Sequence, residues 1–131
     1  MRFDERGQEM KSPYHGIRRI LNAFVYSAAG FSAAFKSEAA FRQDLAVFVI
    51  GTGVALWLPV SFIERVCLIS PLLLILLMEL ANTAIEAVVD RISDDYHILS
   101  KKAKAIGSLL VLIAFINAIL WWAAVLWPLF I

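Results

Sequence analysis

Residues 78–91 read MELANTAIEAVVDR and follow an apolar run, Val66 to Leu77, that carries no charged residue. Four polar side chains recur in this stretch at spacings of three and four residues: Glu79, Asn82, Glu86 and Asp90. Such spacings place side chains along one face of an α-helix. Ionisable side chains are costly inside a hydrophobic span and commonly mark functional positions. The stretch therefore predicts a functional site where a transmembrane helix reaches the membrane surface.

The composition is that of a membrane protein. Of the 131 residues, 61% are hydrophobic and 18% are charged, whereas a soluble domain is only about half apolar. Glycine and proline are scarce, which favours long helices. The net charge of +1, with no basic stripe that carries interleaved aromatics, argues against a nucleic-acid partner. Cys67 is the one cysteine, which excludes an intramolecular disulfide and a cysteine-rich zinc site.

The hydrophobic pattern divides the chain into a tail, one amphipathic helix and three spans. Residues 1–16 are polar and mixed in charge, and we expect them to be flexible. Residues 17–37 carry apolar side chains at steps of three and four, which is typical of a helix in the membrane interface; packing on another protein surface is the alternative. Three runs follow that are long enough to cross a bilayer: 41–60, 62–92 and 100–129. The predicted fold class is an all-α membrane protein that forms a single domain.

The basic residues predict the orientation of the spans. They gather before the first span and around the second connection, at Arg18, Arg19, Lys36, Arg42, Arg91, Lys101, Lys102 and Lys104. Arg65 alone stands at the other end. The positive-inside rule then places the N-terminus and this connection in the cytoplasm and the C-terminus in the periplasm. Trp121, Trp122 and Trp127, near the far end of the last span, form either an interfacial aromatic belt or part of the packed core.

The polar residues at the cytoplasmic end fit the requirements of phosphoryl transfer. That reaction needs a divalent cation, cationic partners for the phosphates and a group that orients and deprotonates the acceptor. Magnesium takes oxygen ligands and usually one or two protein carboxylates, and Glu38 and Glu86 lie near the cytoplasmic ends of their helices. Glu79 lies two turns deeper, about 10 Å along the helix, where it could act as general base on a lipid hydroxyl. Lys104 and Arg19 are available for the polyphosphate.

Other classes of function use the same residues differently. A glutamate in a membrane helix can join two helices by a hydrogen bond or form part of a proton or ion path. A small ion-coupled membrane protein would show polar residues along the other spans, and these offer almost none. A purely structural scaffold gives no reason for carboxylates two turns apart. Asp94 and Asp95, next to a turn, suit solvation or helix capping, and His97 has no cysteine or histidine partner for zinc.

Three motifs resemble the prokaryotic integral-membrane diacylglycerol kinases: Glu38-Ala39-Ala40-Phe41-Arg42-Gln43, residues 79–91, and Ala103-Lys104-Ala105-Ile106-Gly107-Ser108. The similarity runs from about Ile17 to the C-terminus. It implies a homotrimer in the bacterial inner membrane, with one surface helix and three transmembrane helices per subunit and active sites shared between subunits. It also implies transfer of the γ-phosphate of Mg-ATP to the hydroxyl of diacylglycerol, which gives phosphatidic acid.

The resemblance also implies roles for single residues. Glu79 corresponds to the catalytic base with Asn82 beside it, and Glu38 and Glu86 correspond to the ligands of the magnesium that accompanies ATP. Nucleotide contacts are implied for Arg19, Tyr26, Asp95, Tyr96, His97 and Lys104. Lipid contacts are implied for Arg19, Glu79, Ser108 and Trp122. Asp90 would support the site without an assigned role.

Two positions depart from the family pattern. Ala105 stands where the family often has aspartate, so no nucleotide contact is expected from that side chain, and Leu109-Leu110 replaces smaller residues. A sister group phosphorylates undecaprenol and is the alternative within the same class. The Phe41-Arg42-Gln43 form of the first motif resembles the diacylglycerol branch.

Overall fold

The computed structural model describes residues 3–9 and 16–131. This part of the chain contains four helices: α1 (Ile17–Ser37), α2 (Ala39–Trp57), α3 (Phe62–Ile92) and α4 (Ile98–Phe130). The last three are long and apolar enough to cross a membrane. The predicted all-helical class, with an N-terminal helix before three long apolar helices, is therefore confirmed. The chain divides into two compact units, Met1–Ala33 and Ala34–Ile131.

The N-terminal unit consists of a short turn and most of α1. In the turn, the Asp4 carboxylate accepts hydrogen bonds from the backbone N–H groups of Arg6 and Gln8, each at 2.9 Å. The rest of the tail predicted to be flexible, residues 1–2 and 10–15, lies outside the described residues. The large apolar side chains of α1, such as Ile17 and Phe24, are exposed. An exposed apolar stripe on an amphipathic helix suits contact with a lipid surface.

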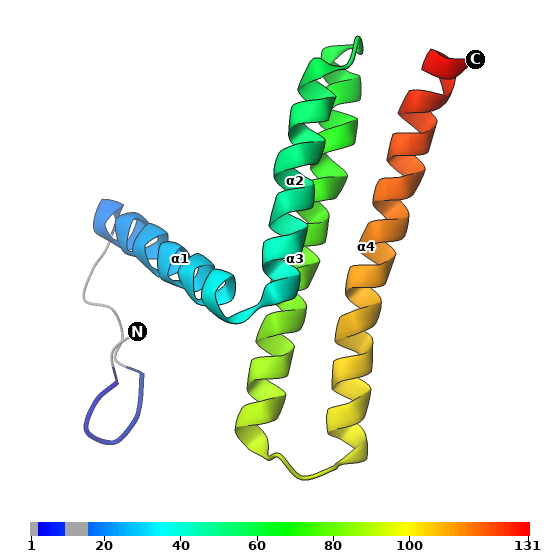
Figure 1. Ribbon diagram of the computed structural model, residues 1–131. Coiled ribbons are helices and arrows are strands. Elements are labelled where there is room, and N and C mark those ends of the chain that lie inside the picture. The colour runs from blue at the N-terminus through cyan, green and yellow to red at the C-terminus, as the bar shows by residue number, and fades with distance from the viewer. Residues whose placement is uncertain (1–2, 10–15) are drawn as a thin grey trace. The chain divides into compact units, whose positions relative to one another are not determined.

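The second unit is a bundle in which α3 packs against both α2 and α4. Figure 1 shows the three helices side by side, with the α2–α3 turn and the end of α4 together and the α3–α4 connection at the opposite end. Three core clusters follow one another along α3, built around Leu68, Leu72 with Ile75, and Leu76. Their partners on the neighbouring helices are mostly small: Ala34, Ala55, Ala114 and Ala118. Small side chains let membrane helices approach closely.

The turn between α2 and α3 is closed by its own side chains. Ser61 caps α3: its hydroxyl accepts from the Glu64 N–H at 3.2 Å, and the Glu64 carboxylate accepts from the Ser61 N–H at 3.3 Å. Arg65 donates to the carbonyl oxygen of Leu58 at 3.2 Å. These bonds satisfy backbone groups that the helix ends leave open, so the two helices form a fixed antiparallel pair.

Trp122 connects α4 to α3 beside a proline. Pro71 lies inside α3 and has no N–H to donate to the preceding turn. The indole N–H of Trp122 donates to the carbonyl oxygen of Leu68, in that turn, at 3.0 Å. Of the two alternatives for the tryptophans, Trp122 takes the packed one, whereas Trp121 and Trp127 are exposed.

Candidate functional site

The polar row on α3 runs from the core of the bundle to its polar end. Glu79 and Asn82 are buried, Glu86 is half-buried and Asp90 is exposed. The Asn82 amide nitrogen donates to Glu86 Oε1 at 3.4 Å. Glu79 and Asp90 are separated by about 16 Å along the helix at 1.5 Å per residue. The row therefore connects a buried carboxyl group to the surface, as the spacing predicted.

Asp44 on α2 completes the buried end of this row, and sequence reasoning missed it. Its side chain is hydrogen-bonded to Glu79, and the two residues are only 9% and 7% exposed. Because an ionised carboxylate can only accept hydrogen bonds, one member of such a pair carries a proton. A signal was present in the sequence: Phe41, Asp44, Leu45 and Phe48 follow the i, i+3, i+4, i+7 pattern of an inward-facing stripe.

Two further carboxylates act on Glu79 electrostatically. These are Glu86, which lies two turns further along the same face of α3, and Glu38, which occupies the N-cap of α2. The Glu38 side chain makes no capping bond and has one long contact, 3.5 Å from the Ser37 hydroxyl. The sequence assigned Glu38 and Glu86 to a metal, and the structure brings both toward the same carboxyl group. In the described residues, no three His, Cys, Asp or Glu side chains form a ready metal cluster.

A polar pocket of about 410 Å³ lies at the connection between α3 and α4. Its lining includes four of the residues assigned to nucleotide: Asp95, Tyr96, His97 and Lys104. His97 is the N-cap of α4, and its Nδ1 accepts from the Leu99 N–H at 3.0 Å. The cap keeps Nδ1 engaged, and His97 is part of the pocket lining. The structure thus gathers these four predicted residues, from the loop and from α4, around one cavity.

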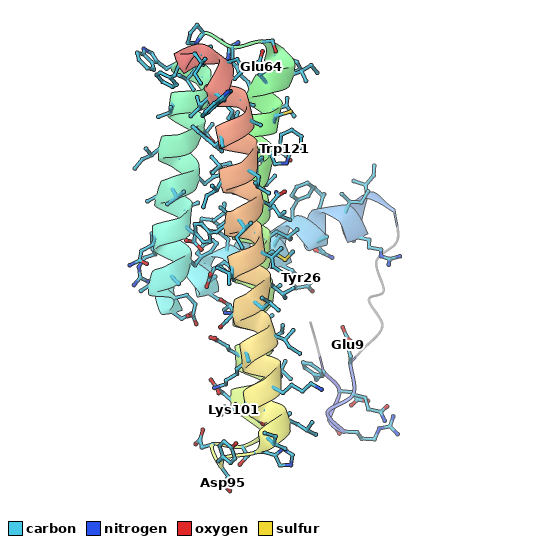
Figure 2. All side chains as sticks on the ribbon, turned by 90° about the vertical axis from the view of Figure 1, so that its right-hand side faces the viewer. Glu9, Tyr26, Glu64, Asp95, Lys101 and Trp121 are labelled. Carbon is cyan, nitrogen blue, oxygen red and sulfur yellow. The ribbon has the colours of Figure 1, made fainter. Side chains whose placement is uncertain are left out.

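Lys104 connects this pocket with the row on α3. Its ammonium group lies 2.7 Å from Asp90 Oδ1, and both side chains are about half exposed. Lys104 also interacts electrostatically with Glu86 and Asp94. The resemblance gave Asp90 no assigned role. In the structure its carboxylate holds the Lys104 ammonium group, which also interacts with Glu86. Figure 2 shows Asp95 and Lys101 at this end of the bundle and Glu64 at the other.

The remaining site residues lie on α1 and on α4. Arg19 and Tyr26 lie on α1 in the N-terminal unit, where Tyr26 is exposed, and their nucleotide contacts stay a prediction. Ser108 is exposed on α4 beside the buried Gly107. Trp122 lies about 21 Å further along that helix and lines an apolar pocket of about 380 Å³ with Val47, Ile75 and Phe115. Ser108 and Trp122 thus mark two separate levels of one helix.

Known proteins are similar in sequence to this chain over nearly all of the helix bundle. The family model described as prokaryotic diacylglycerol kinase matches residues 25–126. The chain belongs to the prokaryotic diacylglycerol kinase family. Among its relatives named diacylglycerol kinase, that of Escherichia coli K12 is 48% identical over 112 residues, which cover 86% of this chain and 92% of the relative. That of Pseudomonas aeruginosa PAO1 is 50% identical over 111 residues, 85% and 90% of the two chains. That of Helicobacter pylori 26695 is 35% identical over 116 residues, 88% and 91%.

Membership in the diacylglycerol kinase family confirms the resemblance read from the three motifs. The matched range holds every candidate site residue except Arg19, which precedes it on α1. Asp44, the residue that the motifs did not single out, also lies inside the matched range.

Proposed function

We propose that this protein transfers the γ-phosphate of ATP to the hydroxyl of diacylglycerol in the bacterial inner membrane, giving phosphatidic acid. The observation that carries the proposal is the buried Asp44–Glu79 pair on helices that could span a membrane, connected by the row on α3 to a polar pocket with a lysine. The names of the relatives, which are diacylglycerol kinases, support the choice of lipid.

Glu79 is the general base of the proposed reaction. For this step the proton of the Asp44–Glu79 pair must lie on Asp44, so that Glu79 is ionised and accepts the proton of the lipid hydroxyl as the oxygen attacks the γ-phosphorus. The bond between that phosphorus and the bridging oxygen of ADP breaks in the same displacement. A buried base next to a membrane surface suits a hydroxyl held at the headgroup level, because water competes less there for the phosphoryl group.

Glu86 and Glu38 fit a magnesium ion. Glu86 accepts a hydrogen bond from the Asn82 amide on Oε1, which leaves Oε2 for a cation, and the Glu38 carboxylate makes a long contact of 3.5 Å with the Ser37 hydroxyl. Two carboxylates match the number that Mg²⁺ usually takes from a protein when it also binds phosphates. When bound, the ion would offset the charge on the phosphate oxygens of ATP.

The nucleotide would occupy the pocket at the α3–α4 connection. Lys104 would exchange its bond with Asp90 for one with a phosphate, a step that is cheap because exposed ion pairs contribute little. Asp95, Tyr96 and His97 would contact the rest of the nucleotide. Arg19 and Tyr26 on α1 would add contacts to it.

The lipid would approach from the bilayer, along the apolar sides of the bundle. Arg19, Ser108 and Trp122 are its proposed contacts beside Glu79, and α1 would lie in the interface with its apolar stripe in the acyl layer. We further propose a homotrimer with shared active sites. The N-terminus would be cytoplasmic and the C-terminus periplasmic, an orientation supported by the gathering of lysines at the pocket end.

The test is radiolabelled ATP with purified protein in mixed micelles that contain diacylglycerol or undecaprenol. We expect label in phosphatidic acid and loss of label with Glu79→Gln. Label in undecaprenyl phosphate alone would assign the protein to the sister activity. Absence of label in either lipid, from protein that retains its helices and oligomeric state, would contradict the lipid kinase.

A further inference from the structure

Gly107 lies where the backbone of α4 meets the side chain of Asn82. The residue is buried, and a Cβ added to it would collide with the amide oxygen of Asn82 and lie 3.2 Å from its Cγ. The Asn82 side chain has little room to move aside, because it is only 8% exposed. Any side chain at residue 107 would therefore turn the Asn82 amide or push α4 away.

The orientation of this amide has a consequence for Glu86. The amide nitrogen donates to Glu86 Oε1, while the amide oxygen is buried and, among the described residues, has no hydrogen-bond partner. A buried acceptor without a donor is unfavourable. On its oxygen side the amide has the contact with Gly107 in place of a hydrogen bond, and on its nitrogen side it has the bond to Glu86.

We propose that Gly107 is a positioning residue that acts through Asn82 on Glu86. The inference rests on the proposed function, in which Glu86 binds the divalent cation. By fixing the amide, Gly107 keeps one oxygen of Glu86 hydrogen-bonded and the other available to the ion. Partners that orient a ligand in this way contribute strongly to metal affinity.

The chain supplies two matched glycines for comparison. A Cβ at Gly51 on α2 would meet the flexible end of the Leu72 side chain at 2.5 Å, so Gly51→Ala produces an apolar clash between helices away from the carboxylates. A Cβ at Gly53 would meet nothing within 4 Å. Gly51→Ala therefore measures the effect of packing strain without contact to the carboxylates. Gly53→Ala measures the effect of replacing a helical glycine by alanine without any clash.

The experiment measures Mn²⁺ binding by electron paramagnetic resonance, without turnover, in the presence of a non-hydrolysable ATP analogue. We expect Gly107→Ala to bind Mn²⁺ about tenfold more weakly than the wild type. Gly51→Ala should lower the unfolding temperature and keep the wild-type Mn²⁺ affinity, and Gly53→Ala should keep both. Equal weakening by Gly51→Ala, or wild-type affinity in Gly107→Ala, would overturn the proposal.

A double-mutant cycle tests whether Gly107 acts through Asn82. Asn82→Ala removes the two atoms nearest to the added Cβ and leaves the Cβ of residue 82 at an ordinary 3.7 Å, so Asn82→Ala and the double variant should bind Mn²⁺ equally. A further loss in the double variant would contradict the inference.

If Gly107→Ala does not assemble, recovery of assembly in the double variant supports the clash with Asn82, and continued failure refutes it. Wild-type protein that labels diacylglycerol but binds no Mn²⁺ would overturn this inference and leave the lipid reaction standing.

Discussion

Asp44 and Glu79 share a hydrogen bond between two buried carboxyl groups, one from α2 and one from α3. Their distance in the sequence, 35 residues, means that the turn at Ser61 and the packing of α2 on α3 set this contact. The position of the proposed base, Glu79, therefore depends on how rigidly α2 and α3 pack as a helical hairpin.

Asp44→Ala should lower kcat roughly a hundredfold, because Glu79 loses the group that orients it. A loss of this size corresponds to the lower end of what a positioned general base contributes. Asp44→Asn keeps a hydrogen-bonding side chain of the same shape and should lose less. Steady-state phosphorylation in micelles measures both. Gln43→Ala, at the exposed neighbouring position, is the control, and wild-type kcat in Asp44→Ala would remove Asp44 from the site.

Glu79→Gln should reduce turnover by about 10²–10⁴-fold, the range attributed to a positioned general base. The amide preserves the size of the side chain and can still bond to Asp44. Helix content by circular dichroism and elution volume in detergent should therefore match the wild type. Turnover within a few-fold of normal would assign the base to another residue.

Glu86→Gln should raise the concentration of Mg²⁺ needed for half-maximal activity by tenfold or more, on the order of the effect of disturbing a metal site. Excess Mg²⁺ should restore part of the rate, since the remaining oxygen still offers a weak ligand. The matched change at the half-buried Glu64, at the opposite end of the bundle (Figure 2), should leave the metal requirement unchanged. An unaltered Mg²⁺ titration in Glu86→Gln would argue against ligation.

Lys104→Met should raise the KM for ATP roughly tenfold, the loss of about 1.4 kcal/mol that a charge-assisted bond to phosphate represents. Stability should hardly change, because an ion pair between exposed side chains contributes little to it. Lys102 is exposed on the same helix and does not line the pocket. Lys102→Met is therefore the control. An equal effect of the two variants would mean that the general positive charge of this end of the bundle attracts ATP, and that Lys104 makes no specific contact.

Trp122→Phe should lower the free energy of unfolding by about 0.5–1.5 kcal/mol, the usual value of one hydrogen bond, because the Leu68 carbonyl beside Pro71 loses its second donor. Denaturant unfolding in detergent micelles measures the difference. Trp121→Phe removes an indole from an exposed position and should change little. Equal stability of the wild type and Trp122→Phe would mean that water or lipid replaces the bond.

The helices and the row on α3 could be predicted because both depend on local periodicity. Uncharged runs of sufficient length define membrane-crossing helices, and spacings of three and four residues align Glu79 with Glu86 whatever surrounds them. The family motifs then supplied roles that no periodicity contains. The four loop and α4 residues assigned to nucleotide line one pocket, and their contact with nucleotide stays a prediction.

The contacts between helices could not be predicted in the same way. Asp44 follows Arg42 and Gln43, so it looked like the polar entry to a span, although the stripe from Phe41 to Phe48 faces the core. The ion pair of Asp90 with Lys104 and the bond of Trp122 to Leu68 join different helices across a connection. Such pairs depend on the rotation and height of each helix, which a single sequence does not give.

The closed turn of the first hairpin bears on how the protein is made. Ser61, Glu64 and Arg65 satisfy the open backbone groups with side chains of the turn itself, so α2 and α3 need nothing from α4 to finish their joined ends. Unsatisfied backbone groups are what a bilayer tolerates least. The hairpin can consequently leave the translocation channel as one unit while the last helix is still being synthesised on the ribosome.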